Sequence, residues 1–337
     1  MIEINGAMGE GGGQIFRSSL TLAMVTGRAV RIHDIRAGRQ KPGLLRQHLT
    51  CLRAAQTISQ AKVKGDEIKS SRVEFIPSDV QAGKYHFAIG SAGSVHLVLQ
   101  TILLPLCFAD GESEITIEGG THNPAAPSAE FMQHCFLPMM KRIGFDIEYS
   151  IEEYGFYPAG GGKIHVRINP VNQLKALVLD SRGELQQVVA TAISSKVPHH
   201  VTERELAVIE NKAAFKSLQL NQKIVNSIGP GNIVSLVVQY ENITEVFECV
   251  GEKSLKAERV AKLALNKAKH YVSARHVVDE YLTDQLLLPM VLARGGQFVT
   301  SDLSRHSETN IDVIKLFEIG DVFHQVTDLG LTQINIK

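Results

Sequence analysis

Apolar and polar residues follow a pattern that recurs along the chain: a short alternating run, a glycine-rich segment, and an apolar stretch at helical spacing. Its first occurrence has an alternating run at residues 2–4, glycines at 9–13, and helical spacing over 15–26. We expect a strand, a turn and a helix there. A second helix is predicted to begin near Pro42, because proline suits the first helical turn, and to continue through Ala55. A strand over 72–76 closes this first unit.

The same order of elements can be traced twice more. The second unit is predicted to contain helices over 91–108 and 128–143, strands over 113–118, 146–151 and 163–168, and a second glycine run at 160–162. The third is assembled from strands over 175–179 and 297–300, helices over 281–292 and 310–317, and terminal strands over 322–325 and 332–336. The pattern therefore predicts an α/β (α+β) fold built of three repeated units.

A segment of different character interrupts the third unit. It contains a predicted helix over 203–218, an alternating strand over 233–240 and a charged helix over 254–271. These periodicities indicate a small α/β domain of its own. We interpret residues 181–275 as this inserted domain, and residues 1–180 with 276–337 as one large domain of three repeated units.

Composition and charge exclude several classes of protein. The 35 basic and 35 acidic side chains cancel, so the protein lacks the overall positive charge that is typical of nucleic-acid-binding proteins. Any contact with a nucleic acid therefore has to be local. Four cysteines, without a Cys-x-x-Cys spacing or a preceding signal peptide, are expected to be reduced thiols of a cytoplasmic protein. The longest apolar stretch, 97–109, contains Gln100 and Pro105 and is shorter than the roughly 20 residues of a membrane span. We therefore expect a soluble protein.

The first glycine run lies between a predicted strand and a predicted helix, where unhindered backbone and free N–H groups can approach a phosphate. It lacks the Gly-Lys-Ser/Thr ending of a phosphate-binding loop, and Gln14 occupies the place of the last glycine in the dinucleotide pattern. A tight turn that needs positive φ angles explains the glycines equally well. The turn does not explain Glu10, whose carboxylate is able to hold a divalent cation beside a triphosphate.

Arginines are concentrated in the loop over residues 35–42. Arg36, Arg39 and Lys41 lie in this loop, and Arg46 with Gln47 follows one turn into the next helix. Because the planar arginine fork binds two phosphate oxygens at once, this group suits a terminal phosphate that must be held in one pose. The alternative is a solvated basic loop, which the apolar residues on both sides make less attractive.

One of the thirteen histidines stands in a distinctive setting. His306 lies in the polar segment over 301–310, which we expect to be a loop joining the strand that contains Phe298 to a helix starting near Asn310. A neutral imidazole can attack the α-phosphorus of a nucleotide and form a labile P–N bond. The other interpretation is an ordinary surface histidine, and the residues alone leave both open.

The segment over 281–285 opens the preceding predicted helix with an aromatic ring, a carboxylate and an amide. Tyr281, Asp284 and Gln285 together offer the stacking surface and hydrogen-bonding edges that an adenine site needs. An ordinary helix start, with Thr283 or Asp284 as its cap, is an equal alternative.

Five segments together resemble the RNA 3′-terminal phosphate cyclase family, and the resemblance extends from Gly6 to about Phe317. Their sequences are GEGGGQIFRS at 9–18, IRAGRQKPGLLRQH at 35–48, FAIGSAGS at 87–94, GFYPAGGG at 155–162 and DQLLLP at 284–289. Matches this long and this many do not arise by chance. The resemblance implies three similar units, each a four-stranded sheet with two helices, and a small insert domain of thioredoxin-like arrangement.

The resemblance also implies roles for individual residues. Members of the family that act as enzymes form a covalent AMP adduct on a histidine at the position of His306, which this sequence keeps. The residues expected to bind adenosine and ribose are Gln100, Pro127, Phe131, Tyr281, Leu282, Thr283, Asp284 and Gln285. Those expected to hold phosphates are Arg17, Arg36, Arg39 and Gln47. Glu10 is expected to lie next to a metal ion, Mg²⁺ or Mn²⁺.

The implied reaction has three steps. ATP adenylylates the histidine with loss of pyrophosphate, AMP passes to an RNA 3′-phosphate, and the vicinal 2′-OH displaces AMP to leave a 2′,3′-cyclic phosphate. We expect ATP and RNA with a 3′-phosphate end as partners, and a homodimer. Two alternatives are a non-catalytic cyclase-like factor of ribosomal RNA processing, which would lack the histidine, and an enolpyruvyl transferase, whose lysine and arginine pattern is absent.

Overall fold

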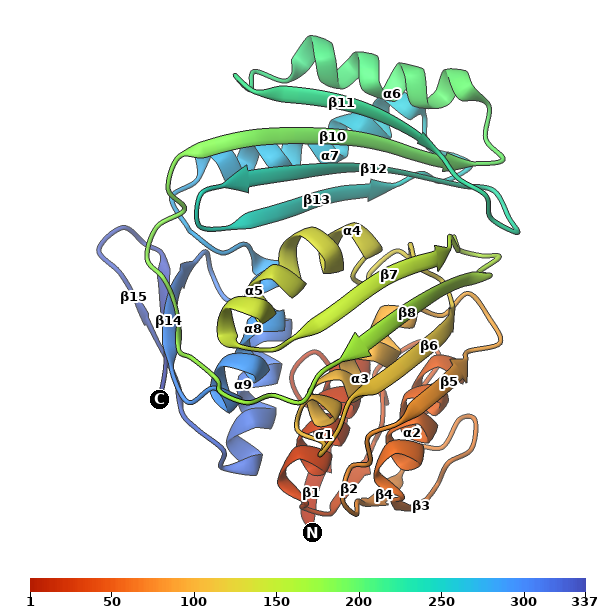
Figure 1. Ribbon diagram of the computed structural model, residues 1–337, viewed down its shortest axis with the longest axis vertical. Helices are drawn as coiled ribbons and strands as arrows, with labels where there is room; N and C mark the ends of the chain where they lie inside the picture. The colour runs from red at the N-terminus through yellow and green to blue at the C-terminus, as the bar shows by residue number, and fades with distance from the viewer.

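The computed structural model describes residues 1–337, which form four four-stranded sheets and the helices that cover them (Figure 1). The elements of the first sheet and its helices are β1 (Ile2–Asn5), α1 (Gly13–Thr26), β2 (Val30–His33), α2 (Arg46–Ser59), β3 (Lys62–Lys64) and β4 (Val73–Ile76). The strand order is β1-β2-β4-β3. The first pair is parallel and the other two are antiparallel.

Two further sheets repeat this order. The second unit comprises β5 (Lys84–Ala88), α3 (Val95–Cys107), β6 (Ser113–Gly119), α4 (Ala129–Phe131), the π-helical turn η1 (Met132–Phe136), α5 (Leu137–Ile143), β7 (Ile147–Glu153) and β8 (Gly162–Ile168). The third comprises β9 (Leu177–Leu179), α8 (Glu280–Leu292), β14 (Gly296–Thr300), α9 (Arg305–Phe317), β15 (Val322–Val326) and β16 (Thr332–Ile336). Their orders, β5-β6-β8-β7 and β9-β14-β16-β15, match that of the first sheet.

The fourth sheet has a different order. Its elements are β10 (Leu185–Ser195), α6 (His199–Lys212), β11 (Leu218–Ile224), β12 (Gly231–Tyr240), β13 (Thr244–Val250) and α7 (Ala257–Ser273). The strands run β11-β10-β12-β13, and only β10 and β11 are parallel. In Figure 1 this sheet lies above α4. Both α4 and the following π-helical turn η1 contact β13.

Helices occupy the middle of the first three units, and the sheets lie outside them. Helix α1 packs against α2, α3 and α9, and α8 packs against α9. Eleven side chains of α3 are buried, as expected of a helix that is apolar on all sides. Strand β6 alternates buried and half-buried residues, because one face of its sheet covers these helices. None of the helices combines the length and apolarity needed to cross a lipid bilayer.

Besides shifts of a few residues in α3 and α7, three predicted helices have different bounds in the structure. The helix expected near Pro42 begins at Arg46, because the Arg36 guanidinium holds the preceding loop through the carbonyls of Lys41 and Gly43, at 2.6 and 2.9 Å. Helix α6 ends at Lys212, and residues 218–224 pair with β10 as a strand.

The third difference affects the segment around His306. Helix α9 begins at Arg305 rather than near Asn310, because the hydroxyl of Ser304 accepts a hydrogen bond from the Ser307 N–H at 3.2 Å and caps the helix. His306 therefore lies in the first turn of a helix and not in a loop.

Candidate active site

The first glycine run brings the starts of α1 and α9 together. Gly9 and Gly11 have φ angles of +54° and +59°, in the left-handed region that favours glycine. A Cβ atom on Gly9 would lie only 2.1 Å from Oγ1 of Thr309, so this close approach to α9 needs glycine. Helix α1 starts after Gly12 without a side-chain cap, which leaves its first N–H groups available to an anion.

His306 lies where these two helix starts meet. Its Nδ1 atom is 2.6 Å from Oε1 of Gln14 and 4.0 Å from Oε1 of Glu10. The imidazole side chain is 58% exposed, while Glu10 is only 8% exposed. The ring is therefore held at one nitrogen and remains accessible to a ligand.

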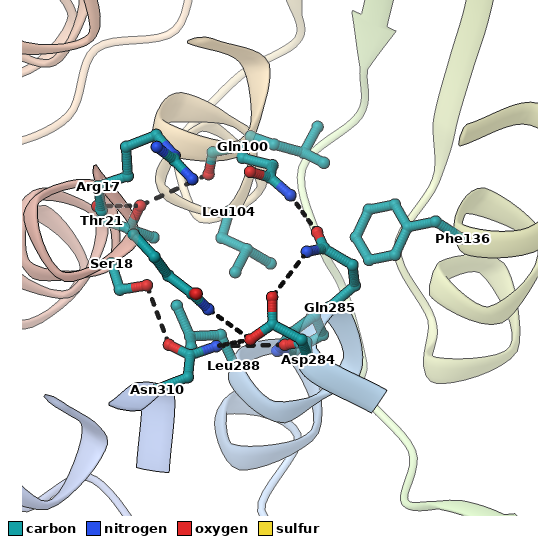
Figure 2. A pocket seen from close by; sticks show the side chains of 13 residues that line it. Arg17, Ser18, Thr21, Gln100, Leu104, Phe136, Asp284, Gln285, Leu288 and Asn310 are labelled. Atoms are coloured by element: carbon teal, nitrogen blue, oxygen red, sulfur yellow. Dashed lines mark hydrogen bonds between the residues drawn. The ribbon is translucent and has the colours of Figure 1, made fainter. Parts of the chain in front are cut away.

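The carboxylate of Asp284 accepts hydrogen bonds from three amides, and Figure 2 shows it with two of them, Gln285 and Asn310. Gln14 donates its Nε2–H to Oδ1 of Asp284. Gln285 donates to Oδ2 at 3.0 Å, and Asn310 donates to Oδ1 at 3.3 Å. Burial raises the pKa of Asp284, and the hydrogen bond from Gln14 opposes this effect. Gln100 extends the network by donating to Oε1 of Gln285.

This network surrounds a cavity of about 60 Å³ between α1, α3, α8 and α9. Its lining combines polar side chains with an apolar wall that includes Leu104, Phe136 and Leu288 (Figure 2). A cavity of this size holds a few water molecules but is smaller than the roughly 300 Å³ of the smallest usual ligand pockets.

Arg17 faces this cavity from α1 without a partner: its guanidinium makes no hydrogen bond or ion pair with the protein. Burial lowers the pKa of Arg17 from its usual value. His48 lies beside it, since a Cβ atom on Gly13 would be within 2.8 Å of both side chains. Burial, together with the positive charges of Arg17 and Arg36, lowers the pKa of His48 to about 3, so this imidazole is neutral near pH 7.

The remaining candidate phosphate ligands are engaged with the protein. Arg39 forms an ion pair with Glu10 and also donates to the main-chain oxygen of Glu10 at 3.0 Å. Arg36 is bound to carbonyls of its own loop, and burial followed by repulsion from Arg39 lowers its pKa. Gln47 accepts from the N–H of Ser94 at 2.9 Å, which joins α2 to the segment over 87–94.

Five candidate nucleotide ligands lie away from the cavity lining. The carbonyl of Pro127 is 2.8 Å from Nδ1 of His96, and Phe131 is buried in α4. Tyr281 is 53% exposed, with the ammonium of Lys267 5.9 Å from its ring centroid.

Leu282 and Thr283 are buried in the core, where the Thr283 hydroxyl donates to Thr300 at 2.8 Å. Only Gln100, Asp284 and Gln285 of the predicted nucleotide ligands line the cavity.

Sequence reasoning missed Gln14, His48 and Asn310 as parts of this site. Gln14 and Asn310 are polar residues that the structure buries in helices, and a polar residue among apolar helical positions is the signal that could have found them. The chain contains no group of three or more His, Cys, Asp or Glu side chains able to hold a metal ion. Glu10 is thus a single carboxylate and not part of a preformed metal cage.

Comparison with known proteins identifies the family. The sequence profile described as RNA 3′-terminal phosphate cyclase matches residues 8–320. A protein of that name from Salmonella agona is 47% identical over 318 residues, which cover 94% of this chain and 92% of the relative. One from Salmonella paratyphi C is 46% identical over 338 residues, covering 100% of this chain and 97% of the relative. The chain belongs to the RNA 3′-terminal phosphate cyclase family.

Proposed function

We propose that this chain is an ATP-dependent RNA 3′-terminal phosphate cyclase that works through a covalent AMP adduct on His306. The observation that carries the proposal is the setting of His306: an exposed imidazole, bound at Nδ1 by Gln14, at the meeting point of two helix N-termini. This arrangement combines a nucleophile with positive electrostatic potential for phosphates. Family membership supports the same activity.

Three transfers at phosphorus make up the reaction. The Nε2 lone pair of His306 forms a bond to the α-phosphorus of ATP, and the bond to the β-phosphate oxygen breaks to release pyrophosphate. An oxygen of the RNA 3′-phosphate then attacks the same phosphorus and the P–N bond breaks. Finally the 2′-OH attacks the 3′-phosphorus and loses its proton, AMP leaves, and the 2′,3′-cyclic phosphate closes.

Arg17 is the strongest candidate for stabilising charge during these transfers. Its guanidinium has no protein partner, so phosphate oxygens are the natural ligands for it in a partly buried site. Arg36, Arg39 and Gln47 are proposed as additional phosphate ligands. Arg39 would exchange its contact with Glu10 for phosphate, which frees the Glu10 carboxylate.

Glu10 is proposed to help bind Mg²⁺ or Mn²⁺. Magnesium is commonly held by one or two carboxylates together with substrate phosphates, and one nearly buried carboxylate 4.0 Å from His306 suits that mode of binding. The metal would neutralise charge on the pyrophosphate leaving group. The protein's own part is to position Glu10, and the 2.9 Å hydrogen bond from its main-chain N–H to Thr309 supports this by fixing the backbone there.

The nucleoside of ATP is proposed to lie beside Gln100, Asp284 and Gln285. Because the present cavity is about 60 Å³, the Gln100–Gln285 hydrogen bond would have to open to admit a base. Pro127, Phe131, Tyr281, Leu282 and Thr283 are retained as nucleotide ligands on the family resemblance alone.

We further propose that residues 181–275 form a small domain of thioredoxin-like arrangement inserted into the large domain over 1–180 and 276–337. The strand order β11-β10-β12-β13, with its parallel pair β10–β11 linked through α6, supports this division. A homodimer stays a prediction, which light scattering on the purified chain tests.

Self-labelling with ATP tests the proposed function. The protein is incubated with Mg²⁺ or Mn²⁺ and α-labelled ATP, then denatured and assayed for label, beside His306→Ala and the exposed-histidine control His324→Ala. We expect acid-labile, base-stable label on the wild type and His324→Ala only. RNA with a 3′-phosphate should discharge it and become cyclic. An unlabelled wild type would overturn the mechanism and favour the non-catalytic alternative.

A further inference from the structure

The carboxylate of Asp284 is occupied by protein groups on both oxygens. Oδ1 accepts from Gln14 and Asn310, and Oδ2 accepts from Gln285 at 3.0 Å. The main-chain oxygen of Asp284 also accepts from Asn310, at 3.2 Å. A carboxylate bonded in this way orients its donors before any nucleotide is bound.

The hydrogen bonds around Gln14 can be arranged in only one way. A carboxylate has no proton to donate, so Gln14 must turn its NH₂ group towards Asp284. Its oxygen Oε1 then faces His306, 2.6 Å from Nδ1, and an amide oxygen can only accept. The proton of the neutral imidazole therefore lies on Nδ1, and the lone pair lies on Nε2.

No other group competes for Nδ1 at this distance. Oε1 of Glu10 is 4.0 Å away, and Arg39 holds the other oxygen of the same carboxylate. His306 comes from α9, Gln14 from α1 and Asp284 from α8, so the relay spans three packed helices. Each of the three side chains is therefore carried by a helix.

We propose that Gln14 is a positioning residue: held by Asp284, it fixes His306 as the Nδ1–H tautomer and so makes Nε2 the only nucleophilic nitrogen. This inference rests on the proposed function for its catalytic consequence. The tautomer itself does not, because it is a property of the protein without ATP.

The neutral amide has a second consequence for the adduct. When Nε2 bonds to phosphorus, the proton stays on Nδ1 and the ring gains a positive charge, because Gln14 cannot take that proton. A positively charged ring leaves readily when AMP is transferred, and the electron pair of the P–N bond returns to Nε2. A carboxylate at position 14 would stabilise the charged ring and so slow the second transfer.

The tautomer is measured directly by NMR on protein containing ¹⁵N-labelled histidine, without ATP. The variants are Gln14→Ala and the nearly isosteric Gln14→Glu. The control is Gln297→Ala, because Gln297 donates to Asp180 at 2.7 Å in an exposed pair of the same kind. We expect the Nδ1–H tautomer of His306 in the wild type and the control. Gln14→Ala should contain a substantial fraction of the Nε2–H tautomer.

Single-turnover labelling then measures separately the transfer of AMP from ATP to His306 and its transfer from His306 to RNA. We expect Gln14→Ala to become labelled at least about 10-fold more slowly than the wild type. Fewer molecules would have the Nδ1–H tautomer of His306, and the ring would be less well oriented. Gln14→Glu should label but discharge to RNA more slowly, and the acid limb of its labelling profile should move to higher pH. Thermal melting confirms that each variant is folded.

The outcomes distinguish this inference from the proposed function. The positioning role of Gln14 would be overturned if folded Gln14→Ala kept the His306 tautomer of the wild type, or if all variants were labelled and discharged at equal rates. The proposed function would still stand if the wild type is labelled. An unlabelled wild type that has the Nδ1–H tautomer would overturn the function and leave the positioning role of Gln14 standing.

Discussion

Gly9 and Thr309 lie so close together that a Cβ atom on Gly9 would be 2.1 Å from the Thr309 hydroxyl oxygen. The same hydroxyl accepts from the Glu10 N–H at 2.9 Å and donates to the Arg305 carbonyl at 2.6 Å. The glycine loop is thus attached to the first turn of α9, which carries His306. Packing at Gly9 therefore controls the distance between Gln14 and the candidate nucleophile.

Gly9→Ala should weaken self-labelling strongly. The new methyl group clashes with Thr309 and the residue must keep a φ of +54°, so the loop and α9 have to separate. We expect labelling to fall about 100-fold or more, measured as the single-turnover rate with α-labelled ATP. Gly27→Ala is the matched control, because Gly27 has a φ of +66° and open space around it. The control should lose about 1 kcal/mol of stability and keep its activity. Equal activity losses in both variants would contradict the role of this contact.

Arg17→Ala should separate activity from stability. An unpaired guanidinium in a partly buried site costs desolvation energy, so its removal should leave the melting temperature unchanged or raise it. The labelling rate should fall about 100-fold, because phosphate charge loses its ligand. Arg17→Lys should recover part of the rate, since it restores the charge without the planar fork. A destabilised variant with normal labelling would show that Arg17 is structural.

Glu245 should make the protein less stable as the pH rises. Burial, with repulsion from Asp279, raises the pKa of Glu245 to about 8, while Cys135 and the Asp279 N–H contact its two oxygens. The folded protein therefore keeps this proton more strongly than the unfolded chain does. Stability from this group is complete below the usual carboxyl pKa and is lost as the pH rises through about 8. Glu245→Gln should melt at least about 3 °C higher than the wild type near pH 8.

Glu114→Gln provides a control of opposite sign. Glu114 is exposed enough to be solvated, and its hydrogen bond with Lys84 lowers its pKa. Its contribution to stability is therefore present at neutral pH and lost on acidification. Glu114→Gln should melt at the wild-type temperature or slightly below it near pH 8. A pH dependence for Glu245→Gln equal to that of the wild type would contradict the assignment to Glu245.

Arg182→Ala should destabilise the protein, because Arg182 connects the beginning of the segment over 181–275 to its end. The guanidinium donates to the Tyr271 carbonyl at 2.7 Å and to the Ala274 carbonyl, and lies 4.7 Å from the Tyr271 ring centroid. We expect a loss of about 2–3 kcal/mol in urea unfolding. Arg204→Ala, which removes an exposed ion pair with Glu258, should cost less than about 1 kcal/mol. A similar cost for both variants would mean that the ends of this segment are not tied through Arg182.

Hydrophobic periodicity predicted most of the elements of the first three units, because their side chains alternate between one buried and one solvated face. It missed the short strands β2, β3 and β5 and, in the fourth sheet, the strands β10, β11 and β13. Strand β11 is almost wholly exposed, so its alternating residues Leu218, Leu220 and Ile224 bury little surface. Strand β13 contains Glu245 in its buried series, and that carboxyl group interrupts the pattern.

The sequence by itself determined the family, through its motifs, and predicted the repeated units from local pattern; it singled out His306 only through the family resemblance. Only the tertiary structure decided that His306 begins a helix, that Arg17 is unpaired while Arg36 and Arg39 are engaged, and that Gln14 meets His306 across 292 residues. Periodicity reports which face of an element is buried. It does not report which polar group meets which, because that choice is made by the packing of α1, α8 and α9 against one another.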